Sequence, residues 1–225
     1  EDVSVDVLLI NTCGFIGDAK EESVQAILEA VERKKQGTVG KVVVFGCLSQ
    51  RYGNELPELI PEVDAWYGAR DFDPVVRELG VEPSKDNVSK RYLTTPSHYA
   101  YLKISEGCDR RCSYCAIPFI RGAHKSVPIE TLVAEAEHLA AKGVKELIII
   151  AQDTTWYGLD LYRRRALAEL LQRLSEVEGI EWIRIHYSYP AAFPEDVLDQ
   201  MAENPKVCRY MDIPLQHISD KVLDN

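Results

Sequence analysis

Three cysteines with the spacing of metal ligands are the residues best suited to chemistry in this sequence. Cys108, Cys112 and Cys115 follow the pattern C-x3-C-x2-C, directly after a strand-like run at residues 101–105. Thiolates this close in sequence can converge on one metal centre without closing a long loop. A 4Fe–4S cluster normally takes four thiolates. Three thiolates therefore leave one iron open, and an open iron can bind a reacting molecule.

A structural zinc site is the alternative for these cysteines. Such a site has four ligands, commonly in two C-x2-C pairs, and no second pair lies nearby. His124 is a candidate fourth ligand, although Pro118 and Gly122 separate it from Cys115. A disulfide framework does not fit a chain in which we find no secretory segment. The spacing favours an iron–sulfur cluster and leaves zinc as the alternative.

The cysteine motif resembles that of the radical S-adenosylmethionine (radical SAM) superfamily, C-x3-C-x-aromatic-C, with Tyr114 as the aromatic residue. In that family the open iron binds the amino and carboxylate groups of SAM, and an electron from the cluster releases a 5′-deoxyadenosyl radical. The resemblance implies that Cys108, Cys112 and Cys115 hold the catalytic cluster. It also implies that Tyr114 packs against the adenine of SAM.

Charge and composition narrow the class of partners. The formal net charge of −10 argues against binding along an extended nucleic-acid backbone, because such binding needs clustered Lys and Arg. A basic protein partner would suit this charge. No apolar run reaches about 18 residues, so we expect no transmembrane helix. Six cysteines with cluster-type spacing predict a reducing, cytoplasmic location.

Residues 1–80 are expected to form an α/β domain. Apolar runs and helical periodicity alternate along them, which predicts a parallel, doubly wound sheet. A polar stretch with two prolines, residues 81–97, is expected to be a linker. The expected strands cover residues 3–10, 41–45 and 64–67, and the expected helices cover residues 18–36, 48–60 and 72–79.

Residues 98–225 show a second alternation of strands and helices. Four parallel strands do not close a barrel, so the sequence predicts truncation at the C-terminal end. The radical SAM resemblance implies the first four units of a partial (β/α) barrel that normally has six. The expected strands cover residues 99–105, 146–151, 182–187 and 210–215, and the helices residues 128–142, 166–177, 195–204 and 219–225.

Cys13 and Cys47 each follow an expected strand of residues 1–80, where open α/β sheets form ligand sites. Taken alone, each is better explained as a small buried hydrophobe. Their surroundings, NTCGFIGDAKEES and VVVFGCLSQRYGNELPE, resemble the N-terminal domain of the methylthiotransferase branch. That resemblance implies a second 4Fe–4S cluster in the full-length protein. Its third cysteine would lie on a first strand upstream of Glu1, which this sequence lacks.

Four polar residues follow expected barrel strands, at the face where barrel active sites gather. The resemblance implies that Gln152, Asp153, Ser188 and Gln216 contact SAM. Capped turns are the alternative explanation for these positions. Arg121 could meet a carboxylate of SAM or of the target, with an ordinary surface ion pair as the alternative.

Several segments, among them SEGCDRRCSYCAIPFIRG, QDTTWYG and IPLQHIS, resemble the ribosomal-protein (aspartate) methylthiotransferases. The resemblance implies transfer of a methylthio group to the β-carbon of an aspartate in a small-subunit ribosomal protein, on the ribosome or free, with an electron donor as a further partner. The alternatives are the same chemistry on a tRNA adenosine and a non-enzymatic iron–sulfur or zinc module. Contact with nucleic acid is expected only through a C-terminal domain outside this sequence, and contact with a membrane is not expected.

Overall fold

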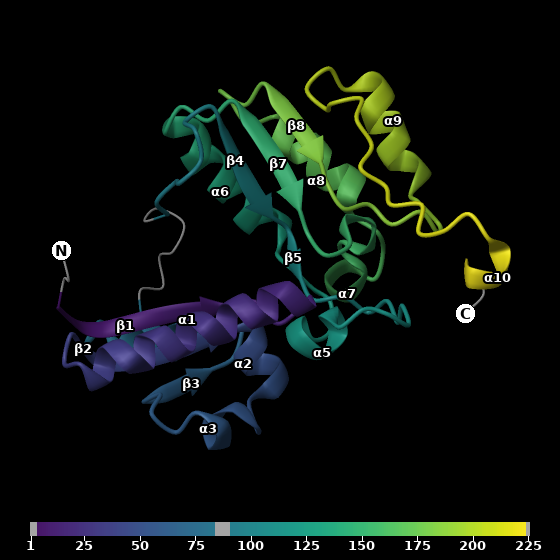
Figure 1. Cartoon of the computed structure of the whole chain (residues 1–225). Helices are drawn as coiled ribbons and strands as arrows, with labels where there is room; N and C mark the ends of the chain where they lie inside the picture. Colours follow the sequence, from purple (N-terminus) through teal and green to yellow (C-terminus); the bar gives the residue numbers. More distant parts are fainter. Residues whose placement is uncertain (1–3, 84–90, 224–225) are drawn as a thin grey trace. The chain divides into compact units, whose positions relative to one another are not determined.

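The structure, a computed structural model, describes residues 4–83 and 91–223 (Figure 1). Its chain divides into two compact units by internal contacts. The first comprises the described residues of Glu1–Lys85 together with Tyr114–Arg121, and the second those of Asp86–Ser113 and Gly122–Asn225. Part of the expected linker, residues 84–90, lies outside the described residues.

The first unit is built on the parallel sheet that the sequence predicts. Strands β1 (Val5–Thr12), β2 (Val39–Gly46) and β3 (Ala65–Tyr67) lie in that order. In register, Thr12 pairs with Gly46, so β1 and β2 end side by side. The long helix α1 (Gly17–Lys35) buries Ile27 and Val31 in a core that also contains Val42 and Val44 of β2.

The single helix expected over residues 48–60 is wrong. The structure has two short helices there, α2 (Cys47–Tyr52) and α3 (Leu56–Leu59), separated by a turn at Gly53 and Asn54. Gly and Asn favour turns over helix interiors, and Pro57 fits the first turn of a new helix. Helix α4 (Phe72–Glu78) matches its prediction, whereas α5 (Ile117–Arg121) was not predicted.

The second unit holds three parallel strands in the order β4 (Tyr99–Lys103), β7 (Glu146–Ile150) and β8 (Trp182–Ile185). Figure 1 shows their three arrows pointing the same way. Helices α6 (Ile129–Ala141) and α8 (Leu167–Ser175) bury apolar faces in the same core as these strands. Fully buried members of this core include Leu102, Leu132, Leu147, Ile149 and Leu171.

The strand expected over residues 99–105 is shorter than predicted, because β4 ends at Lys103. Ser105 and Glu106 form a separate strand, β5, which pairs antiparallel with β6 (Lys125–Ser126). At the edge of the main sheet, Arg91 donates from Nη2 to the backbone carbonyl of Tyr101 in β4 over 2.6 Å and pairs with Glu135 of α6.

The fourth strand expected over residues 210–215 does not form. In this part of the chain the structure shows one parallel bridge, between Ile183 and Val207. Beyond it, the Asp212 carbonyl accepts from the Ser188 N–H, and Pro214 has no N–H with which to extend a ladder. The remaining helices of the unit are η1 (Thr154–Trp156), α7 (Leu159–Tyr162), α9 (Glu195–Glu203) and α10 (Asp220–Leu223). No helix among the described residues has the length and apolar character needed to span a membrane.

Candidate functional site

The loop that carries the cysteine motif is tied to the small β5–β6 ladder. Gly107 has a positive φ of 80°, and a Cβ there would lie 2.2 Å from the Ala123 carbonyl oxygen, so only glycine fits without a shift. The Cys108 N–H donates to the Gly122 carbonyl over 3.0 Å. Asp109 Oδ1 accepts from the His124 N–H over 3.1 Å. The chain entering the motif is therefore held in one defined path.

The three cysteines of the motif are partly exposed. Cys108 and Cys112 belong to the second unit, and Cys115 belongs to the segment Tyr114–Arg121 of the first. Among residues 4–83 and 91–223, no three His, Cys, Asp or Glu side chains form a ready metal site. The assignment of these cysteines as cluster ligands stays a prediction that rests on their spacing.

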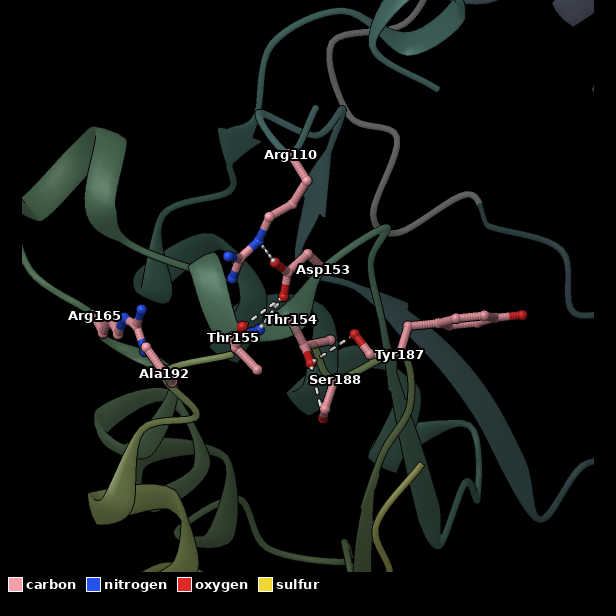
Figure 2. Close-up of polar contacts among 8 residues, drawn as sticks. All are labelled: Arg110, Asp153, Thr154, Thr155, Arg165, Tyr187, Ser188 and Ala192. Atoms are coloured by element: carbon pink, nitrogen blue, oxygen red, sulfur yellow. Dashed lines mark hydrogen bonds and ion pairs between the residues drawn. The ribbon is translucent and has the colours of Figure 1, made fainter. Parts of the chain in front are cut away.

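Asp153 lies beyond the end of β7 and is almost fully buried. Its Oδ1 accepts from the N–H and the hydroxyl of Thr155, at 2.9 and 2.6 Å, and its Oδ2 accepts from Arg110 Nε at 2.9 Å. Figure 2 shows the Arg110 side chain reaching down to this carboxylate. The carboxylate therefore already has three donors from the protein, as the capped-turn alternative expects, and its contact with SAM stays a prediction.

Arg110, inside the cysteine motif, was not singled out in the sequence. Its guanidinium carbon lies 4.4 Å from the ring centre of Trp156 and 4.0 Å from that of Tyr189, in addition to its ion pair with Asp153. Both distances are within the range of cation–π attraction. The sequence offers no signal that separates Arg110 from its neighbour Arg111, because only the folded chain brings residues 110, 153, 156 and 189 together.

Gln152 and Ser188 lie close to the same strand ends. Gln152 Nε2 donates to Glu106 Oε1 over 3.0 Å. Ser188 is buried, and its hydroxyl lies 3.4 Å from the hydroxyl of Thr154, which itself donates to the Tyr187 carbonyl (Figure 2). The structure thus brings Gln152, Asp153 and Ser188 onto the loops that follow β7 and β8. Their contacts with SAM stay predictions.

The other two residues predicted to bind SAM are exposed. Tyr114 has 74% of its surface exposed and belongs to the first unit. Gln216 has a positive φ of 67° and donates from Nε2 to the Pro214 carbonyl over 3.2 Å. The structure supplies no further support for either role.

Two buried polar atoms suit a site that takes a polar ligand. Arg110 Nη2 and Gln152 Oε1 are inaccessible to solvent and have no hydrogen-bond partner among the described residues. Buried polar groups in folded proteins are nearly always satisfied, so such atoms fit a site completed by a bound group. The thiol donors of Cys108 and Cys112 on the adjoining loop are of the type that iron–sulfur clusters require.

His124 is held in a hydrogen-bond network of its own. The ring is buried, and its Nε2 lies 3.1 Å from the hydroxyl of Ser126, which donates to Asp160 Oδ1 over 2.6 Å. Burial lowers the pKa of His124 below its ordinary value, against the attraction of the Asp160 carboxylate. Nε2 is thus engaged, whereas Nδ1 has no hydrogen-bond partner among the described residues, so the zinc alternative stays untested.

Cys13 lies in a loop of the first unit, and Cys47 is the first residue of helix α2 in the same unit. They follow the paired strand ends of β1 and β2, and a Cβ on Gly14 would lie 2.7 Å from the Cys47 carbonyl oxygen. The Cys13 N–H donates to the hydroxyl of Ser23 over 3.0 Å. Cys13 is exposed and Cys47 is partly exposed, which fits ligands better than the alternative of buried hydrophobes.

Arg121 contacts Cys47. Its Nη2 lies 3.1 Å from Cys47 Sγ, within the same unit. The sequence interpretation had linked Arg121 to a carboxylate of SAM or target, or to a surface ion pair. No sequence signal predicted a contact with a cysteine, because Arg121 lies 74 positions after Cys47 in the chain and only the packing of α5 in the first unit brings them together.

Two known protein families match most of this chain. Residues 102–225 match the Radical SAM superfamily, and residues 1–68 match the uncharacterized protein family UPF0004. The first match covers more than half of the sequence. The chain belongs to the radical SAM superfamily. The predicted cofactors, a 4Fe–4S cluster and SAM, are those of this family, and the prediction from the cysteine motif is confirmed at that level.

Three curated relatives of this chain carry the name ribosomal protein uS12 methylthiotransferase RimO. The protein of Christiangramia forsetii is 60% identical over 97% of this chain, that of Flavobacterium johnsoniae 57%, and that of Bacteroides fragilis 54%, each over the same share. The predicted resemblance to this branch is confirmed. The chain spans about half the length of these relatives, 48% to 50%.

Solved radical SAM enzymes share the fold. The radical SAM methyltransferase TsrM of Kitasatospora setae superposes with a TM-score of 0.67 at 14% identity, covering 98% of this chain and 51% of that one. The radical SAM enzyme OxsB gives 0.51 at 12% identity, covering 82% of this chain and 30% of its own. These likenesses confirm the predicted α/β fold class.

Proposed function

We propose that this chain is part of a radical SAM methylthiotransferase acting on ribosomal protein uS12. The supporting observation is the identity of 53% to 60% to relatives with that name, over 97% of the chain. The proposed target atom is the β-carbon of an aspartate. The net charge of −10 is compatible with a basic ribosomal protein as substrate, on the ribosome or free.

We propose that Cys108, Cys112 and Cys115 hold the 4Fe–4S cluster. When bound, the cluster supplies one-electron chemistry on SAM. In this proposal the loops after β7 and β8 contribute to the SAM site: Gln152 and Ser188 offer polar atoms, while Asp153 fixes the turn that carries Thr155. A radical reaction needs no general base, which is consistent with a site whose one buried carboxylate is already hydrogen-bonded three times.

We also propose that Cys13 and Cys47 are two ligands of a second 4Fe–4S cluster, whose third ligand would lie upstream of this sequence. In this proposal residues 1–80 form the second-cluster domain, residues 81–97 the linker and residues 98–225 the partial barrel. An electron donor is a required partner. A reducing cytoplasm is the proposed location, because thiolate ligands must stay reduced.

Electron paramagnetic resonance (EPR) of the anaerobically reconstituted, dithionite-reduced chain tests the cluster assignment. We expect a 4Fe–4S signal that changes when SAM is added, and formation of 5′-deoxyadenosine detected by chromatography. Cys112→Ala should lose the SAM-responsive signal. Cys208→Ala is the matched control, because Cys208 is partly buried beside β8 and has no proposed ligand role.

Three results would contradict the proposal. A cluster whose signal ignores SAM would favour an electron-transfer module. Zinc bound in place of iron after anaerobic reconstitution would favour the structural-site alternative. Retention of the SAM response in Cys112→Ala would show that the ligands were wrongly assigned.

A further inference from the structure

We propose that Arg110 is a positioning residue for the radical SAM cluster, holding the segment between Cys108 and Cys112 against the loops that follow β7 and β8. This inference rests on the proposed function, because it takes the two cysteines to be cluster ligands. This role does not require the Nη2 atom of Arg110, which has no partner among the described residues, to contact the cluster or SAM. It acts through the backbone that it shares with the two cysteines.

The guanidinium of Arg110 is held from three directions. Asp153, which is 2% exposed, accepts from Nε over 2.9 Å, and the Arg110 side chain is itself 18% exposed. The rings of Trp156 and Tyr189 lie 4.4 and 4.0 Å from the guanidinium carbon. Trp156 comes from η1, after β7, and Tyr189 follows β8. The Arg110 side chain therefore contacts the segments that follow two neighbouring strands, β7 and β8.

The surroundings of Arg110 make this contact specific for arginine. A planar guanidinium can stack on aromatic rings while its edge pairs with a carboxylate, and an ammonium cannot do both in the same way. The carboxylate of Asp153 is also held by the N–H and hydroxyl of Thr155, so it is a fixed partner for Arg110. Removing the cation would leave a buried carboxylate without its charged partner, which is strongly unfavourable.

Because Arg110 lies between Cys108 and Cys112, fixing its side chain also restricts the backbone at both cysteines. Cys108 and Cys112 each lie two residues away, and consecutive Cα atoms are about 3.8 Å apart. Cys108 is already held on its other side by its N–H bond to Gly122. For Cys112 the neighbouring Arg111 is exposed, so Arg110 is the nearest preceding residue with a buried side-chain anchor. We therefore expect its loss to affect Cys112 more than Cys108.

The experiment compares Arg110→Met, Arg110→Lys and the control Arg111→Met. The control removes the same charge from the adjacent residue of the same loop. Hydrogen exchange of the metal-free chain is measured first, over residues 108–113. We expect about tenfold faster exchange in Arg110→Met, the size of effect that a lost charge-assisted contact gives. Arg110→Lys should be intermediate, and Arg111→Met should match the wild type.

The second readout is the EPR spectrum of the reconstituted chain. We expect Arg110→Met to hold less iron and to lose most of the SAM-induced change, with partial rescue by lysine. Unchanged exchange in α6 and α8 confirms that a variant is folded. If Arg110→Met fails this folding check, Arg110→Lys carries the test, because it retains the charge.

Failure of this inference and failure of the proposed function give different results. If the wild-type cluster responds to SAM but both Arg110 variants match Arg111→Met in exchange and spectrum, the positioning role is overturned. If the wild-type cluster ignores SAM, the proposed function fails. Hydrogen exchange in the metal-free chain then still shows whether Arg110 holds the loop. Equal exchange in all variants would overturn the positioning role of Arg110 as well.

Discussion

Arg121 donates a hydrogen bond from Nη2 to the Sγ of Cys47 over 3.1 Å. The two residues come from distant parts of the sequence, since Arg121 ends the helix after the radical SAM motif and Cys47 follows β2. Both lie in the first unit. The contact joins a segment of the proposed catalytic motif to a proposed ligand of the second cluster.

This contact predicts an effect on the reduction potential of the second cluster. Hydrogen bonds to ligand sulfurs and nearby charge set such potentials, and a cation favours the more negative, reduced state. In the full-length protein reconstituted with both clusters, Arg121→Met should lower the midpoint potential by on the order of tens of millivolts. For a one-electron couple, a shift of about 59 mV corresponds to a tenfold change in the equilibrium constant. EPR-monitored redox titration measures it. Arg70→Met, an exposed arginine of the same unit, is the control, and equal shifts in both variants would contradict the prediction.

The glycine before the motif gives a second prediction. Gly107→Ala places a methyl group on the carbonyls of Ala123 and Gly122 at a positive φ, so we expect displacement of the loop and loss of most cluster binding. Gly143→Ala is a matched control, because Gly143 also has a positive φ but nothing within 4 Å of the added Cβ. Iron content after reconstitution distinguishes the two. The control should cost about 1 kcal/mol of stability and retain the cluster.

Much of the fold follows from local pattern. The strands β1, β2 and β7 and the helices α1 and α6 were predicted within a few residues, because buried runs and helical periodicity are strong there. Residues 210–215 misled the prediction. Their apolar character resembles that of a strand. However, Pro214 cannot donate a ladder hydrogen bond, and the Asp212 carbonyl accepts instead from Ser188 in the loop after β8.

The candidate site could be predicted less completely. Cysteine spacing points to Cys108, Cys112 and Cys115 as candidate cluster ligands because metal-ligand spacing is visible in the sequence itself, and their role stays a prediction. The contacts of Arg110 and Arg121 depend instead on which distant elements pack together, and no local pattern encodes that. The side chain of Asp153 is predicted to contact SAM, and this contact stays a prediction. The structure shows hydrogen bonds of the Asp153 carboxylate with Thr155 and Arg110, which the sequence did not indicate.

His124 predicts a dependence of stability on pH. Its pKa is lowered by burial, so the folded chain holds it neutral while the unfolded chain binds a proton near pH 6.5. The free energy of unfolding should therefore fall as pH drops below about 6.5, with a slope of up to about 1.4 kcal/mol per pH unit from this residue. Urea unfolding between pH 7.5 and about 5.5 measures the slope. His124→Gln should flatten it, whereas the exposed His98→Gln should not.

Burial in α8 predicts a large difference between two leucine variants. Leu171 is fully buried in the core of the second unit, and Leu198 of α9 is 41% exposed. Leu171→Ala should reduce the free energy of unfolding by about 2–5 kcal/mol, and Leu198→Ala by less than about 1 kcal/mol. Chemical denaturation of both variants checks this, and similar losses would show that α8 does not pack as described.

The contact of Arg91 with β4 has a consequence for how molecules of this protein meet one another. β4 is the last strand in the order of its sheet, and strands in that position can recruit a strand from another molecule. The Tyr101 carbonyl already accepts from Arg91 Nη2, so it is not available to an incoming backbone N–H. Arg91, whose guanidinium also pairs with Glu135 of α6, therefore blocks strand addition at this carbonyl.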